Sequence, residues 1–292
     1  MKQAPPDASS ASLKIVSGFP GQLRYIDACH ATPAADKGIL HKQHVADPCW
    51  ARCVAGGEME KYAAIRGLAP IMSVDALAAA IAELQKHDID RLARDAFAAM
   101  SALLTGPVVT LWILAGDPED PFTVGMAGGV NGSTVGAGKI WLHLVPRPGW
   151  QDRVLTAFAH EYHHSVFIAR HYRGEKSKYL LNYLIMEGMA CAFAEVLAPG
   201  KPQPWTQTIP PGQDKRVWAK MLPHLDCTSE AIMSKFIFGH VDGLPPMCGY
   251  GIGYGIVKAY LAKYPDVRPE EWTSLPAREL LEASGYRGDI KP

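Results

Sequence analysis

Hydrophobic residues recur at helical spacing through the first third of the chain. The pattern is helical from Tyr25 to Leu104. Its clearest helix follows Ser73, a residue type that favours an N-cap, and places Leu77, Ile81 and Leu84 about one turn apart. A second helix is expected directly after it. We interpret both as a packing layer without chemistry.

The pattern changes from helix to strand after Gly106-Pro107. The run from Val108 to Leu114 is apolar and rich in β-branched and aromatic residues, which predicts a short strand. A glycine-rich segment over 126–138 leads into Lys139 to Val145, where apolar residues alternate with others. These segments predict a hairpin or meander with one edge left open.

A long helix is expected next, from Asp152 to about Arg170. Further helices are predicted over roughly 178–197, 231–238, 251–263 and 277–283. No internal repeat is evident. The predicted fold class is α+β, mainly helical, with a small mixed or antiparallel sheet next to the long helix.

Composition and charge narrow the possible partners. The chain has 292 residues, of which 48% are hydrophobic, and 29 Lys+Arg balance 29 Asp+Glu. With no block of like charge, neither nucleic acid nor an anionic membrane surface is expected as a partner. The N-terminal segment lacks the apolar core of a signal peptide, and no run approaches the roughly 18 apolar residues of a membrane helix. We therefore expect a cytoplasmic protein, with export as the alternative; the oligomeric state is left open.

The long helix contains His160-Glu161-Tyr162-His163-His164, an HExxH motif. Residues four apart share a helix face, so His160 and His164 can offer two imidazole nitrogens to one ion. Glu161 is rotated by about 100° from His160, which directs its carboxylate to a water at the ion. The apolar flanks would bury the motif, and burial without a metal would leave its polar groups uncompensated. The motif predicts one catalytic Zn²⁺ with Glu161 as general base; the alternative is a polar patch on an exposed helix.

Catalytic zinc takes three protein ligands, so the third must come from outside the motif. His171 lies about 10 Å along the helix axis from His164, which is too far. Glu187 is the better candidate, because Gly188 beside it would let the two helices approach closely. The competing interpretation is an ordinary exposed glutamate. Glu195 is expected at the surface or behind the ligands.

The HEYHH motif and the EGMA segment at 187–190 resemble the gluzincin arrangement of thermolysin-like peptidases. More specifically, the chain looks like a family of bacterial predicted Zn-dependent proteases. The likeness extends to HVADP at 44–48, GGVNG at 128–132 and GYGIGY at 249–254, and so covers most of the chain. It implies a zincin-like fold and a zinc peptidase. Thermolysin-like enzymes have an Asp four residues after the glutamate ligand, where this chain has Cys191, so the support of His160 is unassigned.

The oxyanion formed during peptide hydrolysis needs a second donor besides the metal. Tyr250 and Tyr254 lie one turn apart, and their Gly-Tyr-x-x-Gly-Tyr pattern resembles a substrate-facing helix of some oligopeptidases. We favour Tyr254, with Tyr250 and His240 as alternatives and plain packing tyrosines as the competing interpretation. His163 points away from the metal face and is expected in the core or behind the ligands.

These predictions divide the chain into four parts that pack as one catalytic unit. Residues 1–15 form a flexible tail and residues 16–105 a helical region. Residues 106–200 form the zincin core, with the sheet, the HExxH helix and the glutamate helix, and residues 201–292 a C-terminal helical region. Because zincins pair an exposed edge strand with an extended peptide, the segment 128–144 is the expected substrate strand.

Three functions remain open from the sequence. The first is a zinc peptidase that acts on peptide or protein substrates. The second is a zinc hydrolase of a non-peptide amide, because HExxH fixes the water-activating chemistry and not the substrate. The third is a zincin-fold binding or regulatory protein with little turnover, which the intact Glu161 disfavours because a scaffold needs no base.

Overall fold

A computed structural model describes residues 12–53, 69–171, 179–239 and 243–288. Between the first strand and the second, the described helices are α1 Phe19–Ala31, α2 Lys37–His41, η1 Lys42–Ala46, α3 Asp47–Cys53, α5 Val74–Leu84 and α6 Ile89–Ser101. The helices predicted after Ser73 are confirmed as α5 and α6. In α6 the Asp88 side chain accepts from the Arg91 backbone N–H at 3.0 Å and caps the helix.

Within the described residues, one four-stranded sheet forms in the order β1-β2-β4-β3. Its strands are β1 Leu13–Ser17, β2 Val109–Ala115, β3 Val130–Gly136 and β4 Lys139–Leu144. β1, β2 and β4 are parallel, and β3 runs antiparallel to β4. The predicted small mixed sheet is therefore confirmed, with β3 and β4 as its hairpin. Among the described strands, β3 is an edge strand and β4 is central.

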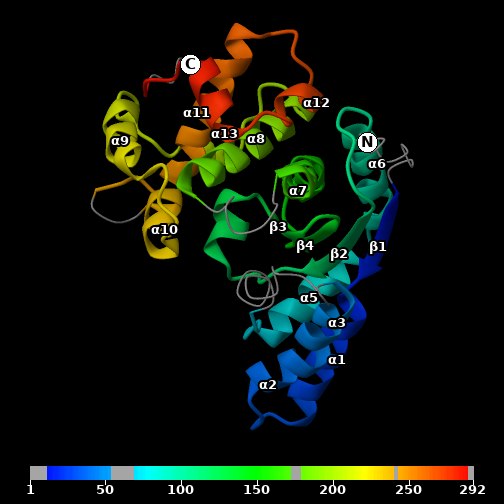
Figure 1. Cartoon of the computed structure of the whole chain (residues 1–292). Helices are drawn as coiled ribbons and strands as arrows, with labels where there is room; N and C mark the ends of the chain where they lie inside the picture. The colour runs from blue at the N-terminus through cyan, green and yellow to red at the C-terminus, as the bar shows by residue number, and fades with distance from the viewer. Residues whose placement is uncertain (1–11, 54–68, 172–178, 240–242, 289–292) are drawn as a thin grey trace, which may run out of the picture.

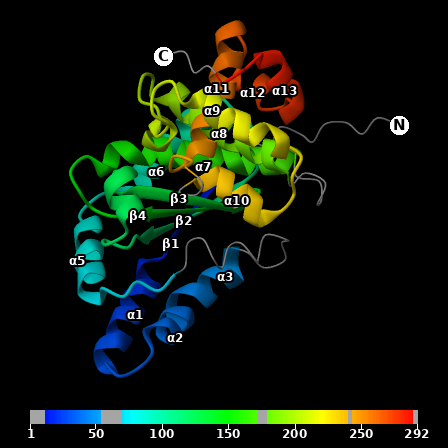
Figure 2. The same ribbon diagram turned by 90° about the vertical axis from the view of Figure 1, so that its left-hand side faces the viewer.

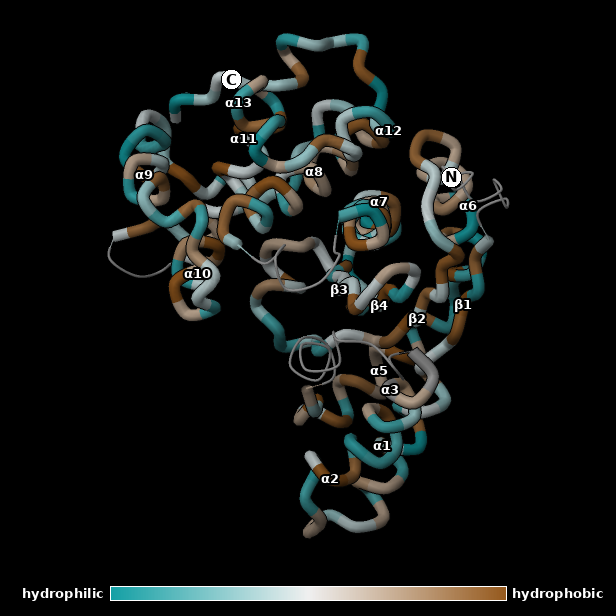
Figure 3. Tube along the Cα trace, viewed as in Figure 1, coloured by the Kyte–Doolittle hydropathy of each residue, from teal (hydrophilic) through white to brown (hydrophobic). Residues whose placement is uncertain are grey.

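The two faces of the sheet are covered by different helices. α7 (Trp150–His171) lies over β3 and β4, whereas α1 and α5 contact β2 from the other side. Figures 1 and 2 show this layering, with α1, α2, α3 and α5 on one side of the sheet and α7 and α8 on the other. Hydrophobic segments follow β2 in Figure 3, while the peripheral α9 carries much hydrophilic surface. The strands thus form the centre of the core.

The C-terminal half packs against α7 through α8 (Leu180–Leu197) and α11 (Cys248–Lys263). Around them lie η4 Pro204–Gln207, α9 Asp214–Met221, η5 Leu222–His224, α10 Glu230–Phe238, α12 Pro269–Trp272 and α13 Ala277–Ser284. By length and apolar composition α8 alone among the described helices has the character of a membrane span, but 78% of it is buried inside the structure. Because it contacts both α7 and α11, we interpret α8 as a core helix.

Two glycines set the spacing between α8 and α11. A side chain at Gly188 would overlap the backbone carbonyl of Gly253, and one at Gly253 would overlap the carbonyl oxygen of Leu184. The helices therefore cross in backbone contact, as only glycine permits. The prediction that Gly188 lets the glutamate helix approach the HExxH helix is wrong, because Gly188 faces α11.

The prediction that residues 1–15 form a flexible tail is wrong for the last residues of that range. Residues 1–11 lie outside the described part of the chain, but Leu13–Ser17 forms β1, paired in parallel with β2 from Leu13↔Val109 to Ser17↔Ile113. The five-residue strand has little local signal, and its partner lies far along the chain. Long-range pairing therefore decides its structure.

Candidate metal centre

The HExxH motif lies in the interior of α7, at the point where the helix faces both β3 and α8. His160, Glu161 and His164 are only 5%, 6% and 7% exposed. Apolar residues before and after the motif pack into the core, so the helix holds these three polar groups away from water. Buried polar groups need partners, and the partners come from α8 and β3.

Three donor atoms converge between α7 and α8. His160 Nε2 and His164 Nε2 are 2.9 Å apart, and Glu187 Oε2 lies 3.3 Å from the first and 3.1 Å from the second. Ligands at about 2.1 Å from a tetrahedral zinc ion are separated by about 3.4 Å. The spacing of the three atoms is therefore that of a ligand set around one small ion.

The hydrogen bonding of Glu187 supports the same interpretation. Its Oε2 is buried and forms no hydrogen bond of good geometry with the described residues, although both imidazoles lie near it. Burial by itself raises the pKa of Glu187, but the neighbouring His164 and His160 rings outweigh it and hold that pKa well below its usual range. An anionic oxygen and two imidazole nitrogens facing one point fit a divalent cation.

Glu161 lies beside this donor set and is held by the edge strand. Its carboxylate lies within 4.8 Å of the ring nitrogens of His160 and His164. The Thr134 hydroxyl lies 2.8 Å from Glu161 Oε2 and 2.7 Å from the Glu161 carbonyl oxygen, and it can donate to either. Gly132 of β3 leaves the space that the Glu161 side chain fills. The strand thus fixes the position of the expected base.

Cys191 occupies the position behind His160. Its Sγ lies 3.6 Å from His160 Nδ1, and the thiol is fully buried. Burial, reinforced by the nearby Glu187 carboxylate, raises the pKa of Cys191 well above its usual range, so the group remains a neutral thiol. With Nε2 turned to the donor set, Nδ1–H faces a sulfur acceptor. Cys191 occupies the sequence position that is an Asp in thermolysin-like enzymes. Its thiol therefore supplies the contact behind His160 that was left unassigned from the sequence.

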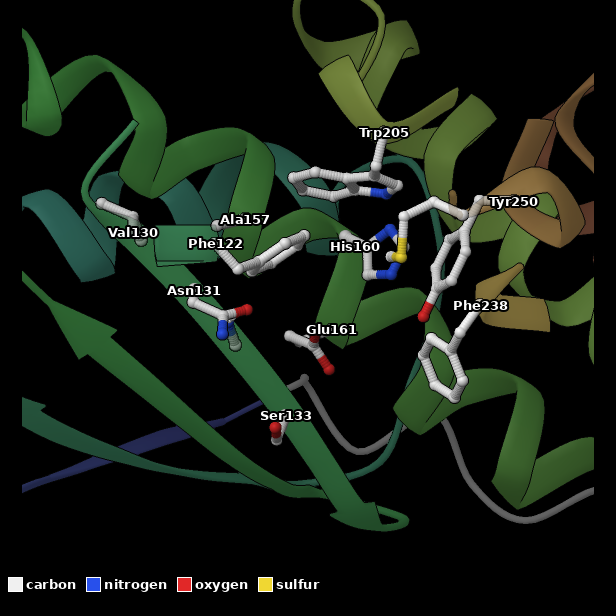
Figure 4. A pocket seen from close by; sticks show the side chains of 12 residues that line it. Phe122, Val130, Asn131, Ser133, Ala157, His160, Glu161, Trp205, Phe238 and Tyr250 are labelled. Atoms are coloured by element: carbon white, nitrogen blue, oxygen red, sulfur yellow. Dashed lines mark hydrogen bonds between the residues drawn. The ribbon is translucent and has the colours of Figure 1, made fainter. Parts of the chain in front are cut away.

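A cavity of about 380 Å³ opens beside the donor set (Figure 4). Its walls are mainly apolar and aromatic, with Phe122, Trp205, Phe238 and Tyr250 around His160. The edge strand forms the opposite wall, through the segment 130–133. A substrate placed in this cavity would thus lie between β3 and the aromatic side chains, directly at His160 and Glu161.

The two candidate tyrosines have different surroundings. α11 begins at Cys248, so Tyr250 and Tyr254 do lie one turn apart on a helix. Tyr250 lines the cavity, whereas Tyr254 does not, and its hydroxyl donates to Glu195 Oε2 at 2.5 Å. Lys258 also contacts that carboxylate, at 2.9 Å. The preference for Tyr254 over Tyr250 is therefore not supported by its position, because the hydroxyl of Tyr254 is engaged away from the cavity.

The other two histidines of α7, His163 and His171, take structural positions. His163 is fully buried, stacks on Trp272 and lies 3.1 Å from the Thr273 hydroxyl, away from the donor set. His171 contacts the Thr273 carbonyl oxygen at 2.7 Å. His240, the third candidate for the oxyanion donor, lies outside the described residues.

Several residues of the site were not predicted from the sequence. Thr134 is one of a run of small polar residues, and nothing in that run marks it as the partner of Glu161. Phe122 and Trp205 belong to short helices, η2 (Phe122–Met126) and η4, that bring them to the cavity from distant parts of the chain. The ring centroids of Trp205 and His160 are 5.9 Å apart, and the two rings meet edge to face. For Phe122 and Trp205, the aromatic side chain is the only feature of the sequence that could have pointed to the site.

An α+β chain that buries two histidines and a glutamate with converging donor atoms is a candidate metalloprotein. The chain belongs to the family described as "Predicted Zn-dependent protease (DUF2268)", whose profile matches residues 89–282 and so includes all three donors. It is 32% identical over 133 residues to the uncharacterized protein YjaZ of Bacillus subtilis (strain 168), covering 44% of this chain and 50% of that protein. The chain thus spans about half the length of this curated relative. No solved structure gives a significant match.

Proposed function

We propose that the protein is a zinc-dependent peptidase of the gluzincin type, with a zincin-like catalytic core. The observation that carries the proposal is the convergence of His160 Nε2, His164 Nε2 and Glu187 Oε2, beside a fourth polar group, Glu161, that is held separately. His160, His164 and Glu187 would hold the ion. When bound, zinc supplies Lewis-acid chemistry, which polarises a carbonyl and lowers the pKa of water.

Glu161 is the proposed general base. Its carboxylate opens into the cavity next to the donor set, and Thr134 restrains one of its oxygens. From this position Glu161 takes a proton from the attacking water and later delivers it to the nitrogen of the leaving amine. The burial of the site excludes bulk water from these transfers and strengthens its electrostatic interactions.

The edge strand and Tyr250 complete the proposed site. β3 pairs only with β4 among the described strands, so its outer edge can add an extended peptide through main-chain hydrogen bonds. Because β3 also lines the cavity, the added peptide would pass directly over Glu161. Tyr250 lines the same cavity and is the proposed donor to the developing oxyanion. The proposed partner is therefore an extended peptide or protein segment.

The test compares the wild-type protein with Glu161→Gln and His160→Ala, by zinc analysis and by cleavage of a fluorogenic peptide library. Glu161→Gln is expected to retain zinc and to lose at least about 100-fold in kcat/KM, the size of a general-base contribution. His160→Ala is expected to lose both zinc and activity. A zinc-loaded wild-type protein that cleaves small amides but no peptide would be the non-peptide hydrolase. One that binds peptides without cleaving them would be the binding protein, and either result would refute the proposal.

A further inference from the structure

A second cavity, of about 430 Å³, lies at the carboxyl ends of the parallel strands β2 and β4. Its walls include Asn131 of β3, His143 of β4 and His41 of α2, together with the loop that follows β2. Asn131 lines this cavity and also the cavity at the metal centre. The two spaces are therefore neighbours that share one residue of the edge strand.

The two cavities belong to opposite faces of the sheet. Side chains alternate along a strand, and Gly132 and Thr134 of β3 face Glu161 on α7. Asn131 directly precedes Gly132 along β3, so its side chain is directed to the other face. His143 stands directly opposite Asn131 in the ladder and shares that face. The second cavity thus lies on the face covered by the N-terminal helices.

The second cavity contains two imidazoles, one buried and one half-buried, with ring nitrogens that have no hydrogen-bond partner among the described residues. His41 is 3% exposed, and no described residue forms a hydrogen bond with its ring. Nε2 of His143 is shielded from solvent and likewise has no described partner. Burial lowers the pKa of each ring to about 4. Both rings are therefore neutral near pH 7, and each offers one acceptor nitrogen.

The other charged groups of this cavity are all acidic. Asp117, Glu119 and Asp120 line it, and no lysine or arginine does so among the described residues. Asp120 accepts from the Thr123 backbone N–H at 3.0 Å, and Asp117 accepts from the Glu119 backbone N–H at 2.9 Å. Carboxylates and imidazole acceptors around one concave space favour a cation with N–H donors. We call this space the acidic cavity.

We propose that the acidic cavity binds the ammonium or guanidinium group of a substrate Lys or Arg, adjacent in sequence to the residue that occupies the cavity at the metal centre. The proposal rests on the proposed peptidase function. An extended peptide added to β3 directs successive side chains to opposite faces. One side chain then enters the aromatic cavity beside His160, and its neighbour lies on the face of the acidic cavity. Lysine and arginine have the length and the charge to enter it.

The test measures binding separately from cleavage. Zinc-loaded Glu161→Gln binds a set of fluorescent peptides that differ only by Lys, Arg, Leu or Glu at each position near the scissile bond. The same peptides are assayed for cleavage by the wild-type protein. The cavity variant is Asp117→Asn with Glu119→Gln, and the matched control is Glu83→Gln with Asp95→Asn on exposed faces of α5 and α6.

At one position, the Lys and Arg peptides are expected to bind about tenfold more tightly than the Leu peptide at low salt, with less difference at high salt. The cavity variant should lose this preference while the control keeps it. Equal affinity of the Lys and Leu peptides at every position would overturn the inference, as would a preference unchanged in the cavity variant. A preference in binding without any cleavage by the wild-type protein would leave the acidic cavity supported and refute the peptidase.

Discussion

Replacing Gly132 by alanine tests whether β3 positions the general base. A Cβ built at Gly132 would overlap Cγ of Glu161 and lie 3.0 Å from both its Cδ and its Oε1. Ordinary carbon contacts lie at about 3.5–4.0 Å, so the carboxylate must move by roughly 0.5–1 Å or the strand must move instead. Gly132 has no positive φ, so the backbone itself accepts alanine. The whole effect is therefore steric and is directed at Glu161.

We expect Gly132→Ala to lower kcat/KM by about 100-fold, because a displacement of about 1 Å has this effect on a positioned catalytic group. Zinc content should remain that of the wild type, since the three atoms nearest to the added methyl group all belong to Glu161 and none to His160, His164 or Glu187. The free energy of unfolding should fall by only about 1 kcal/mol, at the low end for overpacking, because the adjoining cavity gives the side chain room.

The assay combines peptide cleavage, zinc analysis and urea unfolding on Gly132→Ala and on a control, Gly125→Ala. Gly125 also lacks a positive φ, and a Cβ there meets nothing within 4 Å, so the control should retain activity within about twofold. Wild-type activity in Gly132→Ala would refute the argument that the strand fixes Glu161. Loss of zinc would show that moving Glu161 also moves the ligands, which would contradict the geometry of the site.

Two further substitutions test the support of the donor set from α8. Gly188→Ala would push against the Gly253 backbone, and we expect it to lower the free energy of unfolding by about 2–3 kcal/mol and to weaken zinc binding, as measured by urea unfolding and chelator competition. A stable, zinc-binding Gly188→Ala would contradict the tight helix crossing. Cys191→Ala removes the acceptor behind His160, so zinc affinity should fall about tenfold. Cys29→Ala, at a buried cysteine far from the site, should leave zinc affinity unchanged, and equal effects of the two would argue against a specific role for the thiol.

Local periodicity was enough to predict most of the helices and the central strands. α5 and α11 each repeat apolar residues at helical spacing, while β2 is a short apolar run bounded by turn residues. β1 could not be predicted in this way. Its five residues gain their structure from a parallel partner, β2, that follows only after α1, α2, η1, α3, α5 and α6 in the chain, so that no local pattern distinguishes them from the preceding tail.

The residues of the candidate site likewise fall into those that local spacing predicts and those that only the tertiary structure reveals. Helical spacing places His160 and His164 on one face, and an acid in an apolar helix requires a partner, which made Glu187 predictable. The choice between Tyr250 and Tyr254 was not predictable, because both occupy the same helix face. Only the tertiary structure shows that the first turn of α11 reaches the cavity while the second lies against α8.

The donor set depends on how α8 is rotated about its own axis. Glu187 and Cys191 are four residues apart and so share one helix face, as His160 and His164 do on α7. One turn of α8 thus supplies both the third donor and the acceptor behind His160. Gly188, one residue further round, is in backbone contact with α11. Because that contact requires a glycine on the α11 side of the helix, it also holds the Glu187 face towards α7. Metal binding and the packing of α11 should therefore weaken together when this contact is lost.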